Sequence, residues 1–550
     1  MLCTGTSALS WPTLGSAGAP FTDFYSDQRL RFVETKLKDC ISSTLTSHKA
    51  CAHAGHPSIP KRVLDIHTDN IKVIETSEET EDYCALSYCW GSPEGLLKTT
   101  QENLEQMKTR IDWNLLPRVL QDAIFVARKL RTFLIWIDAI CIIQDSEEDW
   151  QVEAAKMGQY YRNAVFTIAT SSSADAQRPF LRPQESQDAR PATTTQSTFD
   201  FVNLDGSVSK IIGRRVPDYA GIALTSNTTL STRGWTWQEN ALSTRVIHFT
   251  SDEIIWECRS QQCFENGATL RSFLGLAFRF AACQENLEYY WKTLIADYSA
   301  RELTYERDRL PAISGVAAEI QKRTKSKYLA GLWREWLHSD LLWYSNWTEL
   351  PPVYKEQHAI PTWSWASING RVGFEYEFCE ESAQHSKIKI ISADCSVRGL
   401  NPLGEVSGGS LTLTGYHCEG KLSCTNNQDR TTYRLRIKKE NINTFRPDSI
   451  LEKFNVGSEA NARVESVRRA SSVELTGVTK SFEVPVLCLL IGGGRYFTKR
   501  AFVSKYGYNY YYLILGLQSS FPLRYTRVGE AKTELRTISW GSARSTITII

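Results

Sequence analysis

The feature that most constrains the fold is an acidic residue inside a dense apolar run, FLIWIDAICIIQD, over residues 133–145. An apolar run of this density predicts a buried strand over 133–137. Asp138 follows that strand directly, and no basic residue stands beside it in the sequence. Because an unpaired buried charge is costly, Asp138 must either end the strand at a solvated edge or meet a cation from elsewhere in the chain.

Length and composition indicate a folded, soluble protein with several domains. The chain has 550 residues, of which 42% are hydrophobic and 23% charged, and one core rarely serves so long a chain. The 63 lysines and arginines nearly balance the 61 aspartates and glutamates, so charge gives no case for nucleic acid or an acidic membrane surface as a partner. No apolar run is long enough to predict a membrane span. The 14 cysteines include no CxxC pair and no signal peptide is recognised, which predicts reduced thiols and a cytoplasmic protein.

The order of apolar segments predicts an α/β fold, a parallel sheet flanked by helices. Strands are expected at RVLDI, IKVIE, YCALS, FLIWI and VFTIAT, with helices over 116–131 and from residue 146 onward. Ser146 and Asp149 have capping-box spacing at the start of the second helix. Strands that alternate with helices in this way run parallel, with the helices packed on the faces of the sheet.

Four regions are predicted along the chain. An N-terminal segment over 1–60, partly disordered and partly helical, precedes the α/β domain at 61–265. The pattern over 266–360 is mostly helical, and alternating β-branched and aromatic residues over 361–550 predict a β-rich C-terminal domain. The charged stretch near 425–475 inside that domain is expected to be a disordered insertion.

Polar side chains are expected to meet at the carboxyl edge of the parallel sheet, where open α/β sheets bind ligands. Asp138 ends one strand there, and YCALSYCWG brings Ser87, Trp90 and Gly91 from another. Two interpretations follow for Asp138. It lines a ligand site with an aromatic wall, or it is structural and caps the next turn or pairs with Arg233.

A third segment, RGWTWQENALSTR, carries Arg233, Gln238 and Glu239 between tryptophans. These polar groups either bind a ligand and orient Asp138, or form a clamp that docks the segment on the sheet. Because Asp138, Arg233 and Glu239 are each costly to bury alone, we expect Arg233 close to one of the two acids.

A group of thiols and imidazoles lies near the N-terminus, at Cys40, His48, Cys51, His53 and His56. These side chains are zinc ligands in other proteins, but their spacing matches no common zinc finger. The sequence leaves open whether the Cys40, His48 and Cys51 cluster binds metal, and we assign no metal site from it.

Three separated segments resemble the three blocks of the fungal heterokaryon incompatibility (HET) domain. They are YCALSYCWG, LIWIDAICIIQDSEEDWQVEAAKMGQYYRNAVFTIAT and RGWTWQENALSTRVIHF, in the expected order over about 83–250. The resemblance implies a protein of a filamentous fungus that acts in non-self recognition and triggers programmed cell death. It also implies protein partners in incompatibility signalling, self-association, and a fold distantly similar to TIR and flavodoxin-like domains.

Many TIR domains cleave NAD with a glutamate on the helix that corresponds to the one after residue 146 here. The resemblance therefore implies NAD as a substrate, and we assign no cofactor. An ungapped comparison places Gln151 at that position, one helical turn or less from Glu148 and Glu153. The candidate catalytic residues are Glu153, Asp138 and Glu148, and the candidate ligand-binding residues are Ser87, Trp90, Gly91, Arg233, Gln238 and Glu239. The alternative is a non-enzymatic signalling module that uses the same fold to self-associate.

Overall fold

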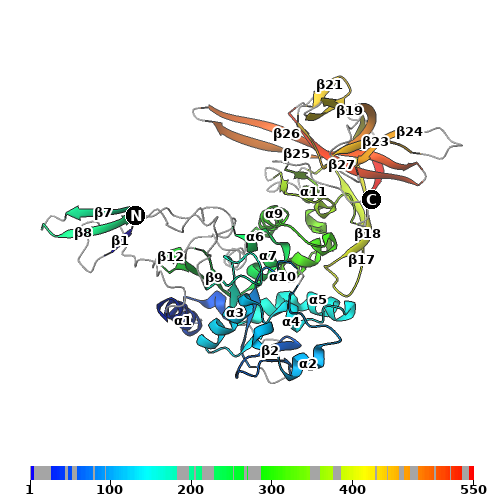
Figure 1. Ribbon diagram of the computed structural model, residues 1–550. Coiled ribbons are helices and arrows are strands. Elements are labelled where there is room, and N and C mark those ends of the chain that lie inside the picture. Colours follow the sequence, from blue (N-terminus) through cyan, green and yellow to red (C-terminus); the bar gives the residue numbers. More distant parts are fainter. Residues whose placement is uncertain are drawn as a thin grey trace. The chain divides into compact units, whose positions relative to one another are not determined.

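The computed structural model describes residues 2–4, 27–43, 47–52, 59–77, 81–92, 95–181, 197–202, 206–213, 228–251, 253–265, 269–270, 286–346, 360–375, 386–427, 430–442, 444–456, 464–470, 481–500, 503–520, 522–534 and 544–550 (Figure 1). The chain divides into two units, Met1–Gln284 and Glu285–Ile550. The predicted division into four regions stays a prediction.

A nine-stranded mixed sheet forms the centre of the first unit. Its strands, in sheet order, are β12 (Thr269–Leu270), β11 (Gln262–Phe264), β10 (Ile254–Cys258), β9 (Arg245–Phe249), β6 (Thr167–Ala169), β4 (Tyr83–Ser87), β5 (Leu134–Trp136), β2 (Arg62–Asp65) and β3 (Lys72–Glu75). Only the central strands β9, β6, β4 and β5 run parallel, and the outer strands pair antiparallel. The expectation of a parallel sheet is therefore corrected: strands joined by helical crossovers are parallel, whereas the short connections at both edges reverse the chain.

Helices cover both faces of this sheet. The helices of the first unit are α1 (Asp27–Ser42), α2 (Leu104–Thr109), α3 (Arg118–Lys129), α4 (Asp138–Cys141), α5 (Glu147–Asn163), α6 (Thr229–Thr232) and α7 (Gly234–Leu242). Because side chains alternate between faces along a strand, Cys84 and Leu86 of β4 join the core that α1 and α3 complete. Tyr83 and Ala85 join the opposite core, which is formed with α5. Since α7 packs along α5, both lie on that second face.

Both predicted helices are present: α5 starts after its Ser146 cap as expected, and α3 starts at Arg118 rather than at residue 116. The Ser146 hydroxyl accepts the backbone N–H of Asp149 at 3.2 Å and caps α5. Pro117 stands directly before α3, where its missing N–H costs no helical hydrogen bond. A separate three-stranded sheet consists of β1 (Leu2–Thr4), β8 (Val208–Gly213) and β7 (Ser197–Val202).

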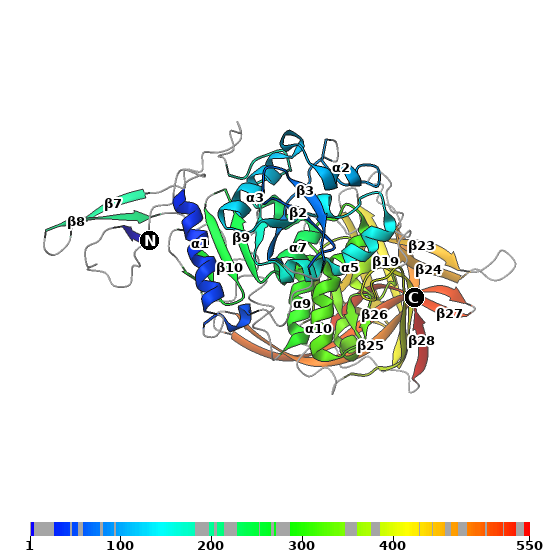
Figure 2. The same ribbon diagram turned by 90° about the horizontal axis from the view of Figure 1, so that it is seen from below.

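A mostly antiparallel sheet dominates the second unit, as the prediction of a β-rich C-terminal part requires. Its strands, in order, are β17 (Lys389–Val397), β18 (Val406–Gly415), β28 (Ser545–Ile549), β27 (Leu523–Thr533), β26 (Val503–Ser520), β25 (Phe482–Arg500), β19 (His417–Asn427), β20 (Arg430–Ile437) and β21 (Glu440–Ile442), with β22 (Thr444–Pro447) on β27. Before it in the chain come the helices α9 (Leu287–Tyr298) and α10 (Ser314–Thr324) (Figure 2). The short helix α11 (Leu337–Asp340) and two hairpins, β13 (Tyr328–Leu329) with β14 (Leu332–Trp333) and β15 (Trp343–Ser345) with β16 (Val372–Phe374), also precede the sheet.

The stretch near 425–475 is not a disordered insertion over its described residues. Strands β20, β21 and β22 run through it, followed by the hairpin of β23 (Leu451–Val456) and β24 (Val464–Arg469). Some of its charges are buried and paired: Asp448 is fully buried and accepts hydrogen bonds from Arg469 and Arg527. High charge indicates disorder only where those charges stay in water.

Candidate functional site

Asp138 lies directly beyond the carboxyl end of β5, at the first residue of α4. Its carboxylate is held by Trp90, whose indole Nε1 donates to Oδ1 at 3.1 Å and to Oδ2 at 2.9 Å. The backbone N–H of Ala139 donates to Oδ1 at 2.7 Å. Asp138 and Trp90 are both half-buried, so the carboxylate lies at the edge of the core rather than inside it.

Glu239 brings a second carboxyl group to Asp138 from α7. Its side chain is only 4% exposed, and this burial, followed by the negative charge of Asp138, raises the pKa of Glu239 to about 7. The hydroxyls of Ser87 and Tyr161 and the positive charge of Arg233 act in the opposite direction on this pKa. Two acids from different segments therefore share one site.

The carboxyl group of Asp138 also titrates far from its ordinary range. The surrounding protein displaces water and raises the pKa of Asp138 to about 6, against the lowering effects of the Ala139 N–H, Arg233, Trp90 and Tyr88. Environments that give neighbouring carboxyl groups different pKa values are typical of acid–base catalysis. Because the two acids interact, the values describe the pair.

Arg233 joins the first and third segments. Its guanidinium Nη1 donates to the backbone carbonyl of Tyr88 at 3.0 Å, and its charge lowers the pKa of both Asp138 and Glu239. The expectation that Arg233 lies close to these acids is thus met. Gln238, the neighbour of Glu239 on α7, is also buried.

Gly91 allows the chain to turn directly after Trp90. Its backbone has a φ of +75°, and a Cβ at this position would lie 2.4 Å from the Cβ of Asp175. Any side chain would therefore clash with the loop that follows β6, quite apart from the strain of the positive φ. The turn after Trp90 therefore requires glycine.

The remaining acidic candidates have different surroundings. Glu153 is fully buried on α5, and its Oε2 accepts the hydroxyl of Tyr160 at 3.0 Å. Burial raises the pKa of Glu153, and the nearby ion pair of Arg62 and Asp149 acts on it in both directions. Glu148 is exposed on the first turn of α5. Asp138, Arg233 and Glu239, and not Glu153 or Glu148, make the described contacts that join the three segments.

Sequence reasoning missed two residues that the fold brings in. Tyr161 contributes a hydroxyl beside Glu239, and its type gave no signal beyond apolar periodicity, whereas Tyr88 was expected at this edge with Ser87 and Trp90. Cys258, at the end of β10, joins Cys40, His48 and Cys51 in a cluster of four groups that could hold a metal ion. The spacing along the chain could not reveal it, because Cys258 is more than two hundred residues from the other three. His53 and His56 lie outside the described residues.

Comparison with protein families identifies the segment that contains the site. Residues 83–239 match the family model described as heterokaryon incompatibility protein (HET). The match begins at the first residue of β4 and ends at Glu239, so it spans the segments that supply both acids. No curated protein and no solved structure was found to match the chain. None of the helices within the described residues is long and apolar enough to cross a membrane.

Proposed function

We propose, on the premise that residues 83–239 form a HET domain, that the protein is an incompatibility effector that promotes cell death by hydrolysing NAD. The HET match supports a role in heterokaryon incompatibility. The observation that carries the enzymatic part is the pairing of Asp138 and Glu239, two acids with raised pKa values beside a cation and a half-buried indole. A TIR-like relationship and programmed cell death belong to the same proposal.

The reaction is the hydrolysis of one glycosidic bond. The bond between C1′ of the ribose and the pyridinium nitrogen breaks, and the nitrogen takes the electron pair, so nicotinamide leaves as a neutral molecule without needing a proton. Positive charge develops on the ribose, as in other glycoside hydrolyses. Water then adds to C1′ and releases one proton, and the products are nicotinamide and ADP-ribose.

The two acids suit the two needs of this reaction. Asp138, with a pKa of about 6, is mostly ionised at neutral pH and would stabilise the cationic ribose. Glu239, with a pKa of about 7, is divided between its two forms and would accept the proton of the attacking water. Arg233 would attract the pyrophosphate, and the half-buried Trp90 would offer a ring against the nicotinamide.

The test combines a purified protein with a cellular readout. We expect the full chain to release nicotinamide and ADP-ribose from NAD, and overexpression to lower cellular NAD before cells die. Asp138→Asn and Glu239→Gln should abolish both effects, since an amide keeps the shape of the side chain but not its charge. Glu105→Gln, at an exposed carboxyl group of α2, is the control and should keep both. Cell death with unchanged NAD would contradict the enzymatic proposal.

A non-enzymatic signalling module is the second candidate, and one observation favours it. The hydrogen bonds of Asp138 with Trp90 and of Arg233 with Tyr88 hold the three HET segments together, and such contacts are also expected if the residues have a purely structural role. In that case Asp138→Asn should remove one of the two negative charges near Arg233 and lower stability, and killing should fall in step with protein abundance. Toxicity and melting temperature measured on the same variants separate the two candidates.

A further inference from the structure

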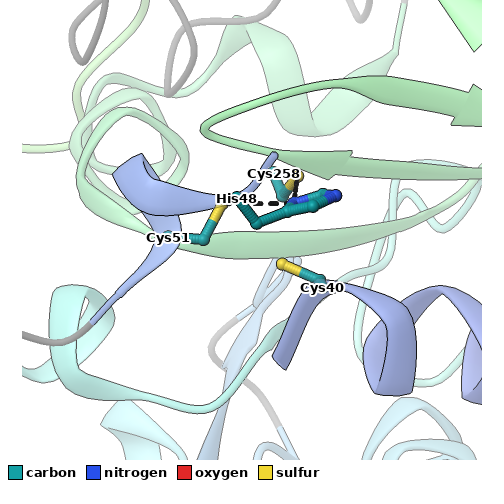
Figure 3. Close-up of side chains that lie close together, drawn as sticks. All are labelled: Cys40, His48, Cys51 and Cys258. Carbon is teal, nitrogen blue, oxygen red and sulfur yellow. Dashed lines mark hydrogen bonds between the residues drawn. The ribbon is translucent and has the colours of Figure 1, made fainter. Parts of the chain in front are cut away.

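We propose that Cys40, His48, Cys51 and Cys258 bind one structural zinc ion. All four residues are buried, and their ligand atoms lie within 4.8 Å of one another. Figure 3 shows the side chains converging from three segments: the last turn of α1, the short 3₁₀ turn at Lys49–Cys51 with the residue before it, and the end of β10. Neither the HET match nor the proposed hydrolysis requires this cluster.

The two distances from His48 to cysteine sulfurs match tetrahedral zinc. With Zn–S bonds of about 2.3 Å and Zn–N bonds of about 2.0–2.1 Å, tetrahedral geometry places a bound sulfur and nitrogen about 3.6 Å apart. His48 Nδ1 lies 3.5 Å from the Cys258 sulfur and 3.7 Å from the Cys51 sulfur. Three cysteines and one histidine form a common structural zinc set, and four protein ligands leave no open position for catalysis.

A buried arginine provides the charge that such a site needs. Three thiolates and a neutral imidazole leave a zinc complex with one net negative charge. Arg245, which is 2% exposed, donates from Nε to the Cys40 sulfur at 3.1 Å and from Nη2 to the Cys51 carbonyl at 3.1 Å. The hydroxyl oxygen of Ser260 lies 3.5 Å from the Cys51 sulfur. These groups would neutralise and orient the ligands from the second layer of the site.

The position of the cluster indicates what the metal would do. Cys40, His48 and Cys51 precede the matched segment 83–239, and Cys258 follows it, so the ion would tie together the two flanks of the HET segment. Cross-links between positions so distant along the chain restrict the unfolded state strongly.

The same ion would fix the end of α1. This helix lies beside β10 (Figure 2), and its start is already held by the buried ion pair of Arg29 with Glu265 at 2.8 Å. A metal bound by Cys40 would anchor the other end of the helix, so that α1 is attached to the sheet at both of its ends.

The decisive measurement is the metal content of the purified full chain. We expect one zinc per chain by elemental mass spectrometry, and loss of that zinc in His48→Ala and Cys258→Ala. Cys263→Ala is the matched control and should keep it, because Cys263 is an equally buried thiol on the neighbouring strand β11, outside the cluster. A folded wild-type chain without zinc, or undiminished zinc in folded Cys258→Ala, would overturn the proposal.

A second measurement covers variants that fail to fold. Wild-type protein loaded with Co²⁺ should develop thiolate-to-cobalt charge-transfer bands and the visible bands of tetrahedral cobalt. Removal of zinc by a chelator should lower the melting temperature by several degrees, and added zinc, but not magnesium, should restore it. A disulfide between any two of these cysteines in anaerobically purified protein, found by mass spectrometry after alkylation, would overturn the proposal.

Discussion

The indole nitrogen of Trp90 donates to both carboxylate oxygens of Asp138, at 3.1 and 2.9 Å. The two residues follow the ends of β4 and β5, which are adjacent parallel strands, so the fold itself brings them together. This contact lowers the pKa of Asp138, whereas burial raises it to about 6. Burial acts most strongly on this pKa, and Trp90 is one of the groups that lower it, together with the Ala139 N–H, Arg233 and Tyr88.

Trp90→Phe should shift the pH dependence of NAD hydrolysis. Phenylalanine keeps an aromatic ring but removes the donor, so the pKa of Asp138 should rise above about 6. Because ionised Asp138 is the active form in the proposed reaction, the acidic limb of the pH–rate profile should move to higher pH. Trp113→Phe, at an exposed indole, should leave that limb in place. A folded Trp90→Phe with an unmoved acidic limb would contradict the role of this hydrogen bond.

Glu239→Gln should stabilise the protein at high pH while abolishing hydrolysis. The pKa of Glu239 is about 7 in the folded chain against an ordinary 4.5, so the folded state holds more protons between these values. Stability then falls as pH rises through this window, by about 3 kcal/mol in total. A glutamine does not titrate, so the Glu239→Gln variant does not lose stability in this way as the pH rises.

The measurement is denaturant unfolding at pH 5 and pH 8. The advantage of Glu239→Gln over the wild type should be larger at pH 8, where Glu239 is ionised. A variant that is less stable than the wild type at pH 8 would mean that the charge of Glu239 supports the fold, against the raised pKa.

The sequence predicted those features that depend on neighbouring residues. Asp138 could be placed at a strand end because the apolar residues before it favour burial, whereas burying an unpaired carboxylate is costly. The start of α5 followed from Ser146 and Asp149, since capping is decided within one helical turn. The antiparallel direction of the outer strands was not predicted, because it depends on whether the chain crosses over the sheet or turns back directly after each strand.

Apart from Arg233, the partners of the site could not be predicted in the same way. Nothing local places Glu239 beside Asp138, because the position of α7 depends on its packing against α5. The direction in which Glu153 points was also hidden, since it depends on the contact with Tyr160. Cys258 joined its cluster only through the register of β10 on β9, where it stands opposite Arg245.

Glu153→Gln decides between the two assignments of the catalytic acid. If Glu153, which lies within one helical turn of the TIR glutamate position, acts on the substrate, its loss should lower hydrolysis by about 10²-fold or more. We expect hydrolysis to remain instead, because Glu153 is fully buried and a glutamine oxygen can still accept the Tyr160 hydroxyl. Hydrolysis by Glu153→Gln and Glu239→Gln should be measured side by side. If Glu153→Gln is well folded but inactive while Glu239→Gln stays active, Glu153 is the catalytic acid.

Asp448→Asn should strongly destabilise the second unit. Asp448 is fully buried, and its Oδ2 accepts from Arg469 Nη2 at 2.5 Å and from Arg527 Nε at 3.0 Å. Arg527 also lies 3.7 Å from the ring centroid of Trp343 and is itself fully buried. An asparagine would leave two buried guanidinium groups without their shared negative charge. Removing one partner of a buried ion pair costs about 3–5 kcal/mol, which is a large part of the stability of a domain.

The matched control is Glu452→Gln, which removes a carboxylate from the same part of the chain. Glu452 pairs with Arg468 at 2.7 Å, but both side chains are more than a third exposed, so water replaces the lost contact. Pairs of this kind contribute about 0–1 kcal/mol. Denaturant unfolding of both variants should therefore separate them clearly. Equal stability of Asp448→Asn and Glu452→Gln would mean that the cationic pair is neutralised by other groups and that Asp448 does not hold this unit together.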